Sequence, residues 1–304
     1  MSNKKIFINA PVARGAWDYI LSGYKSAWEH FGFQVQMIDD LANIEEKKND
    51  YYIFTFNWNT KTYDHIKKIK DSINTFVFVQ SDNFPPPWGG HPNFTDQAPP
   101  HVSEHLNNDE NIFLWTFTNA PENMYKKYSK KIEYIPLAFD SINYKEMPDD
   151  KYRYDVCYVG GWANNGFNEK QKIMMDHFKA FRKSGLRCGF FINKNISLEE
   201  EAKVLFNSKI SINIHDAYQR KLGYDTNERT FKALGLGGFL VSDHIDELSS
   251  LLPEVYLSKT PDHMVNIIKD NINKDLSELK RHNKEEILKN HTYIKRVERM
   301  IEAI

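Results

Sequence analysis

Most of the side chains that could do chemistry in this sequence lie in one polar stretch near residue 220. The strand-like run KISINIHDAYQR (Lys209–Arg220) leads through a loop into TNERTFKALGLGGFLVSD (Thr226–Asp243), a pattern typical of a short helix and a second buried strand. In open α/β sheets, ligands bind at the carboxyl edge of the strands. The side chains that this order places at such an edge are His215, Asp216, Arg220, Asn227, Glu228 and Arg229.

These residue types suit the binding of an anion. A helix that begins near Asn227 would direct free backbone N–H groups and the positive end of its dipole toward the edge. Arg229, together with Arg220 or Lys221, would add positive charge for a diphosphate, and arginine offers the better bidentate geometry. The stretch therefore predicts an anion site that needs no metal.

Two glycine turns add to this prediction. Gly160 and Gly161 follow a strand-like run, and the absence of a side chain would let a ligand approach the backbone closely. Arg14 and Gly15 occupy the equivalent turn after the first strand-like run of the chain.

Each of these residues also has a purely structural interpretation. Glu228 and Lys232 are four residues apart and can pair on the surface of a helix. His215 can equally be a hydrogen-bonding residue at a strand end, and the glycines at 235, 237 and 238 can simply end the helix. The prediction rests on the convergence of these residues at one edge.

Strands alternate with helices along the whole chain, which predicts parallel βαβ units. Helices are expected at Trp17–His30, Thr60–Asp71 and Ala120–Ser129, and over the last thirty residues. The expected strands are Lys5–Asn9, Gln34–Ile38, Tyr51–Phe56, Thr75–Gln80, Ile112–Thr116, Ile132–Leu137, Asp155–Val159, Cys188–Ile192, Ile210–Ile214, Phe239–Ser242 and Val255–Leu257. The polar segment Asp140–Tyr154 has no apolar period, so we place a domain boundary there and predict domains at 1–145 and 146–290, with a C-terminal helix at 291–304.

One long loop interrupts this alternation. Ser81–Pro100 carries six prolines and directly follows a predicted strand. A loop of this length in a compact domain is usually functional or disordered. Asp82 is our candidate for a catalytic base and His91 is the second candidate; the alternative is a flexible surface insertion.

The composition is that of an ordinary globular protein. The 40 Lys and Arg residues nearly balance the 41 Asp and Glu residues, so no global field draws the chain to nucleic acid or to anionic membranes. No secretory signal or membrane-spanning run is visible, and we expect a cytoplasmic protein. Aromatic residues make up 14%, which indicates core packing or a cleft that stacks a base or a sugar.

Several common catalytic motifs are missing from the sequence. It has no GxxxxGK[ST], no GxGxxG after a strand, no GxSxG and no HExxH or CxxC, which disfavours P-loop, dinucleotide, α/β-hydrolase and zinc enzymes. No Asp-x-Asp triplet offers the usual carboxylate ligands for a divalent metal beside a nucleotide diphosphate. We expect no bound cofactor and no metal.

The run from Asn227 to Asp243 resembles the donor-binding segment of group-1 glycosyltransferases, in particular the CgeB-like branch named after a spore-maturation protein. The opening of the second domain, Tyr154–Gly161, resembles the first strand and glycine turn of that family's donor domain. His291-Thr292-Tyr293 with Arg296-Val297 resembles its C-terminal helix, and Asp82 with the following prolines resembles its Asp-x-Pro stretch more loosely. The resemblance covers about half of the chain.

This resemblance implies an α/β fold of the GT-B type, in which two doubly wound Rossmann-like domains face a central cleft. It implies a nucleotide-sugar co-substrate bound mainly by the second domain and an acceptor bound mainly by the first. Gly160, Gly161 and Arg229 would lie near the diphosphate, and Asn227 and Glu228 near the sugar or phosphate.

One residue departs from the family's pattern. Relatives usually read Phe-Glu-Ala, with the Glu bound to the ribose hydroxyls, where this chain reads Phe231-Lys232-Ala233. Lysine cannot accept a hydrogen bond. Ribose must therefore be bound in another way, or the nucleotide is unusual.

The sequence leaves three functions open. The first is a glycosyltransferase that acts on a glycan or a small molecule. The second is a glycosyltransferase that modifies bases in DNA, for which only Lys67–Lys70 and Lys126–Lys131 hint at a basic groove. The third is a two-domain protein that binds a sugar or nucleotide without turnover.

Overall fold

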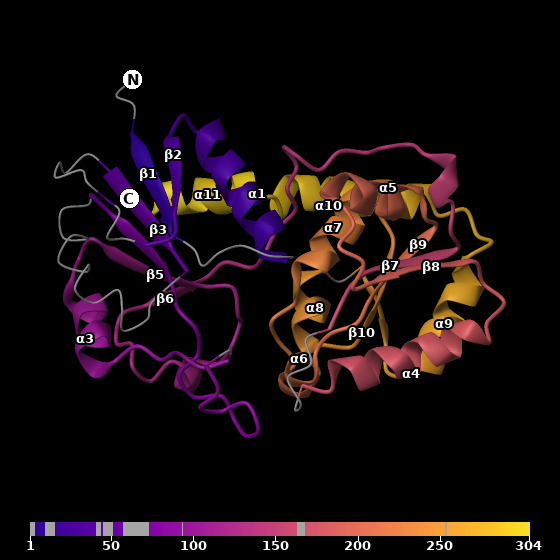
Figure 1. The fold of residues 1–304 in the computed structure, drawn as a ribbon, viewed down its shortest axis with the longest axis horizontal. Helices are drawn as coiled ribbons and strands as arrows, with labels where there is room; N and C mark the ends of the chain where they lie inside the picture. Colours follow the sequence, from indigo (N-terminus) through magenta and orange to yellow (C-terminus); the bar gives the residue numbers. More distant parts are fainter. Residues whose placement is uncertain are drawn as a thin grey trace. The chain divides into compact units, whose positions relative to one another are not determined.

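A computed structural model describes residues 4–9, 16–40, 44, 51–56, 73–92, 94–162, 168–252 and 254–304 of the chain. It contains two parallel sheets with flanking helices (Figure 1). The chain divides into two compact units: unit 1 is Met1–Pro136 with Arg296–Ile304, and unit 2 is Leu137–Lys295. The boundary was predicted at 145, whereas the first segment of unit 1 ends at Pro136.

Unit 1 is built on a six-stranded sheet in the order β2-β1-β3-β4-β5-β6, and each pair is parallel. Its strands are β1 (Lys5–Asn9), β2 (Gln34–Ile38), β3 (Tyr51–Thr55), β4 (Thr75–Phe78), β5 (Ile112–Thr116) and β6 (Ile132–Tyr134). All six were predicted from their apolar, β-branched and aromatic runs, some with longer ends. Strands buried on both faces give such runs in a parallel sheet.

Aromatic side chains fill the space between this sheet and α1 (Ala16–His30). Tyr24 and Trp28 are fully buried on α1, and the ring of Tyr24 lies 4.7 Å from that of Phe54 on β3. Trp28 in turn packs 5.7 Å from Phe76 on β4. Much of the high aromatic content therefore serves core packing in unit 1.

Unit 2 holds the second sheet, five parallel strands in the order β11-β10-β9-β7-β8. Its strands are β7 (Val156–Gly160), β8 (Cys188–Ile192), β9 (Ile210–Asn213), β10 (Leu240–Asp243) and β11 (Tyr256–Ser258). The chain enters the sheet at β7, moves outward to β8, returns to β9 beside β7 and continues outward to β11. Successive strands thus run outward on both sides of β7, which is the doubly wound arrangement expected from the sequence.

Helices pack on both faces of the second sheet (Figure 1). On one face, α4 (Lys170–Arg182) and α9 (Pro261–Asn271) contact each other, and their apolar side chains join Ile210, Ile212 and Ile214 in one core cluster. On the other face, α7 (Glu228–Leu236) contacts α5 (Leu198–Asn207) and α10 (Ser277–Asn290). The shorter helices are α6 (Ala217–Leu222) and α8 (Asp246–Leu251).

The end of α7 agrees with the predicted glycine stop. Gly237 is the C-cap, and Gly238 adopts a φ of 72°, a left-handed conformation that favours glycine. A Cβ at Gly238 would lie 2.6 Å from the backbone oxygen of Lys280 on α10, so a side chain there would also collide with the neighbouring helix.

Two helical predictions in unit 1 differ from the structure. The helix expected at Ala120–Ser129 is only a 3-10 turn, η3 (Glu122–Met124), because the segment is held by bonds from neighbouring loops instead of an apolar face. The prolines at 99 and 100 were read as loop, yet Pro100 begins α3 (Pro100–Asn108). Proline is tolerated at the first helical position because its missing N–H would have no partner there. The expected helix at Thr60–Asp71 lies outside the described residues.

The C-terminal helix α11 (Tyr293–Glu302) was expected from the apolar stripe at 293, 297, 300 and 304. Tyr293, Val297 and Met300 are buried, whereas Ile304 lies beyond the helix and is 43% exposed. In the described part of the chain, no helix has both the length and the apolar character needed to cross a membrane.

Candidate functional site

The carboxyl edge of the second sheet is organised around Arg229, the second residue of α7. Its Nε donates to the backbone oxygen of Val159 at the end of β7 (2.6 Å), and its Nη1 donates to Oδ1 of Asn213 at the end of β9 (2.8 Å). The guanidinium carbon also lies 4.8 Å from the ring centre of Tyr158. These contacts fix the cation across two strand ends, and within the described residues Nη2 donates no hydrogen bond.

Gly160 is a glycine because Arg229 leaves no room for a side chain. A Cβ at this position would lie 2.4 Å from Nη2 of Arg229. A Cβ at the next residue, Gly161, would collide with Oδ1 of Asn193, which accepts a hydrogen bond from the backbone N–H of Trp162 (3.2 Å). The structure therefore brings the predicted glycine turn and Arg229 together.

His215 lies behind this edge and is fully buried. Its Nδ1 is 2.7 Å from Oδ1 of Asp243 at the end of β10, and its backbone N–H donates to both oxygens of that carboxylate. Its Nε2 contacts Thr226 and Asn213. Arg220 approaches the same carboxylate from α6 at 3.5 Å, with 30% of its side chain exposed.

The charge on Asp243 should contribute to the stability of unit 2. Burial alone would raise the pKa of this carboxyl, but His215, Lys170 and Arg220 hold it down to about 2, from 3.8. A depressed pKa gives stability that is present above the unfolded value and is lost as the pH falls through the folded value. We expect about 2 kcal/mol of unfolding free energy to be lost from this group between about pH 4 and pH 2.

Urea unfolding of the wild type and of Asp243→Asn across this range would check the prediction. The two free energies of unfolding should converge as the pH falls, since both side chains are then uncharged. A difference that stays constant down to pH 2 would contradict it.

The start of α7 agrees with the prediction for Asn227, which is its N-cap residue. Its side chain makes no capping bond, and the buried Oδ1 has no hydrogen-bond partner among the described residues. Because a buried, unsatisfied oxygen is unfavourable, this position is suited to a ligand that donates a hydrogen bond.

Lys232 lies one turn deeper between α7 and α5. Its Nζ is 2.7 Å from Oε1 of Glu201 on α5 and 3.7 Å from Oε1 of Glu228, and all three side chains are buried. Tyr144 donates a short hydrogen bond to the other oxygen of Glu201. Burial raises the pKa of Glu228, but Lys232 and Arg229 outweigh it and lower that pKa overall. Lys232 thus holds two carboxylates together between the two helices.

Two further charged residues of this edge form a pair. Lys170, at the start of α4, lies 3.0 Å from Oδ1 of Asp216 and donates a short hydrogen bond to the backbone oxygen of Ile214. Sequence reasoning named Asp216 but missed Lys170, because an isolated lysine at a helix start is normally exposed.

Sequence reasoning also missed Asn213 and Thr230. The signal was present in β9 and the two residues after it, where Ser211, Asn213 and His215 alternate with three isoleucines. Alternation of this kind places the polar side chains on one face of a strand. In this buried strand, that face is the one covered by α7.

Unit 1 carries the other predicted residues. Both oxygens of Asp82 accept backbone hydrogen bonds, from Lys126 (3.0 Å) and Lys127 (2.6 Å). The backbone of His91 bonds within its own loop, and its ring lies 5.6 Å from that of Phe94. Arg14 and Gly15 lie outside the described residues.

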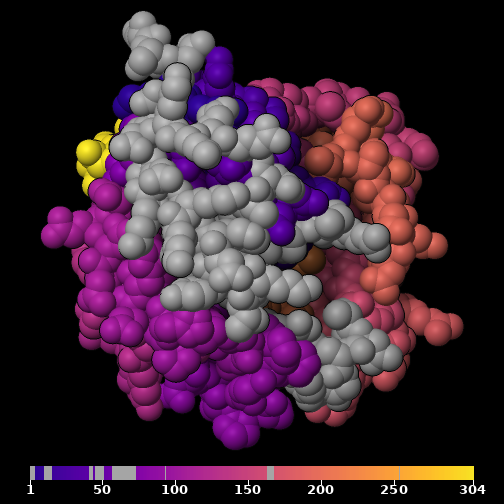
Figure 2. Space-filling view, turned by 60° about the vertical axis from the view of Figure 1, so that its left-hand side comes forward, coloured from indigo at the N-terminus to yellow at the C-terminus, as the bar shows by residue number. Residues whose placement is uncertain are grey.

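The loop that carries Asp82 follows β4 and lies at the surface of unit 1 (purple in Figure 2). Its own side chains pack together: Trp88 is buried, and the rings of Phe84 and Phe94 lie 6.3 Å apart. The loop is therefore packed and hydrogen-bonded in its described part, which disfavours the interpretation as a flexible insertion.

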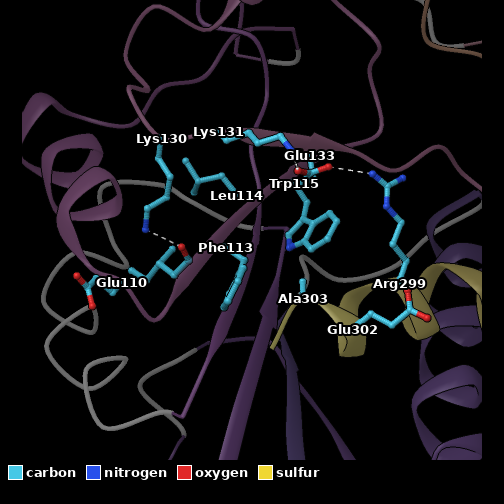
Figure 3. Close-up of a pocket in the computed structure, with 11 residues that line it drawn as sticks. Glu110, Phe113, Leu114, Trp115, Lys130, Lys131, Glu133, Arg299, Glu302 and Ala303 are labelled. Carbon is cyan, nitrogen blue, oxygen red and sulfur yellow. Dashed lines mark hydrogen bonds and ion pairs between the residues drawn. The ribbon is translucent and has the colours of Figure 1, made fainter.

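A separate pocket of about 550 Å³ lies elsewhere in unit 1 (Figure 3). It is bordered by Phe113 and Trp115 of β5, by the start of β6 and by Arg299 near the end of α11. Arg299 pairs with Glu133 at 2.9 Å on its rim. None of the predicted site residues lines this pocket, which lies toward the amino ends of the two strands.

Across the described ranges, no group of three or more His, Cys, Asp or Glu side chains is arranged to hold a metal ion. The charged residues near the sheet edge instead form pairs: Lys170 with Asp216, Arg220 with Asp243, and Lys232 with Glu201 and Glu228.

Comparison with known families gives one match for part of the chain. Residues 158–302 match the family described as "Glycosyl transferase-like", a range that begins within β7 and includes the whole edge around Arg229. No match is found among curated proteins.

Solved structures resemble the whole chain. The T4 phage protein BGT, in complex with its UDP-glucose substrate, aligns with a TM-score of 0.59 and 12% identity over 94% of each chain. Anabaena HepE, in complex with UDP and glucose, aligns with a TM-score of 0.61 and 12% identity over 99% of this chain and 100% of its own. An alpha-glucosyltransferase in complex with UDP and a 13-mer DNA containing an HMU base aligns with a TM-score of 0.58 and 10% identity over 95% of each chain.

At these identities the likeness establishes the fold, which is that of the GT-B glycosyltransferases. The fold class expected from the sequence is confirmed. The family match over residues 158–302 agrees with this fold, and the group-1 type stays a prediction. The CgeB-like subtype stays a prediction.

Proposed function

We propose that this protein is a glycosyltransferase that moves a sugar from a nucleotide sugar to a glycan or small-molecule acceptor. The observation that carries the proposal is the position of Arg229 at the carboxyl ends of β7 and β9. Its Nη2 lies against Gly160, whose missing side chain leaves room for the guanidinium beside the backbone of β7. The first turn of α7 adds the positive end of a helix dipole beside it.

A UDP-sugar is the first donor to test. Two of the proteins that share this fold were solved with UDP-glucose or with UDP and glucose. The sugar itself is left open, because no described contact of unit 2 distinguishes one hexose from another or from a pentose.

Ribose recognition must differ from that of the relatives with a glutamate at position 232. Glu228 lies one turn before Lys232, is buried, and keeps a negative charge through Lys232 and Arg229. A carboxylate held in this way accepts hydrogen bonds from two neighbouring hydroxyls. We therefore assign the ribose hydroxyls to Glu228, with Lys232 as the residue that fixes it; Glu228→Gln should weaken UDP binding, and unchanged affinity would remove this role.

In the proposed reaction the leaving diphosphate gains charge as the bond to the sugar breaks. Arg229 and the N–H groups at the start of α7 would stabilise that charge in place, without a metal ion. An inverting reaction would also need a base on the acceptor side. Asp82 is our first candidate and His91 the second.

Asp82 also anchors its loop through Lys126 and Lys127, so Asp82→Asn is a better test than alanine because it keeps one acceptor oxygen. If Asp82 is the base, this variant should bind UDP like the wild type and transfer sugar more slowly. Transfer at the normal rate would exclude this role.

The proposal is tested by the thermal stability of the wild type with UDP, GDP, CDP, ADP and their sugars. Binding of a nucleotide to the folded state alone should raise the melting temperature, and one nucleotide should stand out. If no nucleotide changes the melting temperature, the proposal fails.

A DNA acceptor is a second possibility, because one protein of the same fold was solved with DNA that contains an HMU base. The lysines proposed for a basic groove do not favour it. Lys127 and Lys130 donate to backbone oxygens and Lys131 pairs with Glu133, while Lys67–Lys70 lies outside the described residues. DNA binding that falls steeply with salt would support this alternative.

A non-enzymatic binding protein is the third possibility. It predicts stabilisation by a nucleotide sugar with no turnover, neither transfer nor slow hydrolysis of the donor. Release of free UDP from UDP-glucose, measured over hours with the wild type and with Arg229→Ala, separates a slow enzyme from a binding protein.

A further inference from the structure

Strand β9 places two kinds of side chain on its two faces. Its isoleucines join the core under α4 and α9, whereas Asn213 and, just past the strand, His215 face α7. Both polar side chains have no exposed surface. Buried polar groups need partners, so their hydrogen bonds define how the edge is held.

The contact with Arg229 identifies the orientation of the Asn213 amide. An arginine can only donate hydrogen bonds, so the atom of Asn213 that lies 2.8 Å from Nη1 must be the carbonyl oxygen. The amide nitrogen therefore points the other way, to Oγ1 of Thr230 (2.9 Å) and Nε2 of His215 (3.3 Å).

The amide in turn fixes the protonation of His215. The Asn213 nitrogen is donor-only, so Nε2 of His215 must accept. Its Nδ1 then carries the proton and donates to Asp243 (2.7 Å). Oγ1 of Thr226 lies 3.2 Å from Nε2 and 2.9 Å from Oγ1 of Thr230, which closes a ring of four buried side chains.

We propose that His215 is a positioning residue for the donor site: through Asn213 it sets the orientation of the Arg229 guanidinium. His215 does not contact the donor in this account. The inference rests on the proposed function, because it assumes that Arg229 binds the diphosphate.

Loss of the Nε2 acceptor of His215 would change how the Asn213 amide is held. Without it, the amide nitrogen keeps only the Thr230 hydroxyl as a partner, and a hydroxyl can accept or donate. The amide is then held less firmly in the orientation that presents its oxygen to Arg229. Arg229 would keep its charge and its bond to Val159. Its contact with Asn213, which orients the guanidinium, would weaken.

Two substitutions of the same residue separate positioning from folding. His215→Asn can still donate to Asp243 but has no acceptor where Nε2 was, whereas His215→Gln can place its oxygen near that point. Both lose the imidazole ring, so both should lower the urea midpoint to a similar extent.

We expect the affinity for UDP, measured by calorimetry, to fall about tenfold in His215→Asn, the effect of losing one orienting hydrogen bond. The affinity for UDP should recover in His215→Gln, whereas the urea midpoint should stay low. In an Arg229→Ala background, the change to Asn should have no further effect on affinity.

Asn213→Ala removes the side chain that joins His215 to Arg229 and should give the same tenfold loss of affinity for UDP. This variant tests the proposal if the His215 variants do not fold. Wild-type affinity in Asn213→Ala or in His215→Asn, or equal losses in His215→Asn and His215→Gln, would overturn the proposal. Failure of the wild type to bind any nucleotide would instead contradict the proposed function, and the inference with it.

Discussion

Arg229→Ala should weaken the binding of UDP by about 30- to 150-fold, or about 2–3 kcal/mol. The substitution removes a cation that Val159 and Asn213 fix across the ends of β7 and β9. Hydrogen bonds between charged groups, such as guanidinium and phosphate, are among the strongest in proteins because both partners carry charge. Isothermal titration of UDP into both proteins measures the effect.

A matched control is available on the surface of the same unit. The side chain of Arg153 is 69% exposed and pairs with Asp150. Arg153→Ala removes the same net charge and should leave the affinity unchanged. If the two variants lost affinity equally, the effect would be one of general charge, and the assignment of the diphosphate to Arg229 would be wrong.

Lys232→Ala should lower the unfolding free energy of unit 2 by about 3–5 kcal/mol, the usual effect of breaking a buried ion pair from one side. The carboxylates of Glu201 and Glu228 would stay buried without their shared cation. The pKa of Glu228 should rise, because burial raises it and Lys232 counteracts that effect. Urea unfolding near pH 7 measures the loss.

Two comparisons make this prediction specific. Lys203 on α5 pairs with Glu199 at 2.8 Å on a more exposed part of the same helix layer, so Lys203→Ala should lower the free energy of unfolding far less than Lys232→Ala does. The double variant Lys232→Met with Glu201→Gln keeps an acceptor for Tyr144 and should recover part of the loss. Equal effects of the two lysine substitutions would contradict the account.

Much of the fold could be predicted from the sequence, because parallel strands buried on both faces leave strong local patterns. VCYVG in β7 and LVSD in β10 are short apolar runs that end in polar or small residues. The predictions failed where a few tertiary contacts decide the local structure. Residues 120–129 contain apolar and helix-forming residues, yet bonds to Asp82 and packing of Tyr125 and Tyr128 hold them in turns.

The position of the site in the fold could be predicted from the sequence, but the contacts among its residues could not. The motif around Arg229 marked the sheet edge, and Gly160 was named with it. The link through Asn213 required knowledge of which face of β9 is covered by α7. Lys170 and Glu201 could not have been found, since their burial depends on partners that are distant in the sequence.

The central claim is that the edge around Arg229 binds the diphosphate of a nucleotide sugar. The most direct test compares the affinities of the wild type for a nucleoside diphosphate, the matching monophosphate and the nucleoside, starting with UDP, UMP and uridine. We predict that affinity falls stepwise and that UDP binds at least about a hundredfold more tightly than uridine, a difference of about 2.7 kcal/mol. Equal affinities for all three, or a difference that persists unchanged in Arg229→Ala, would contradict the claim.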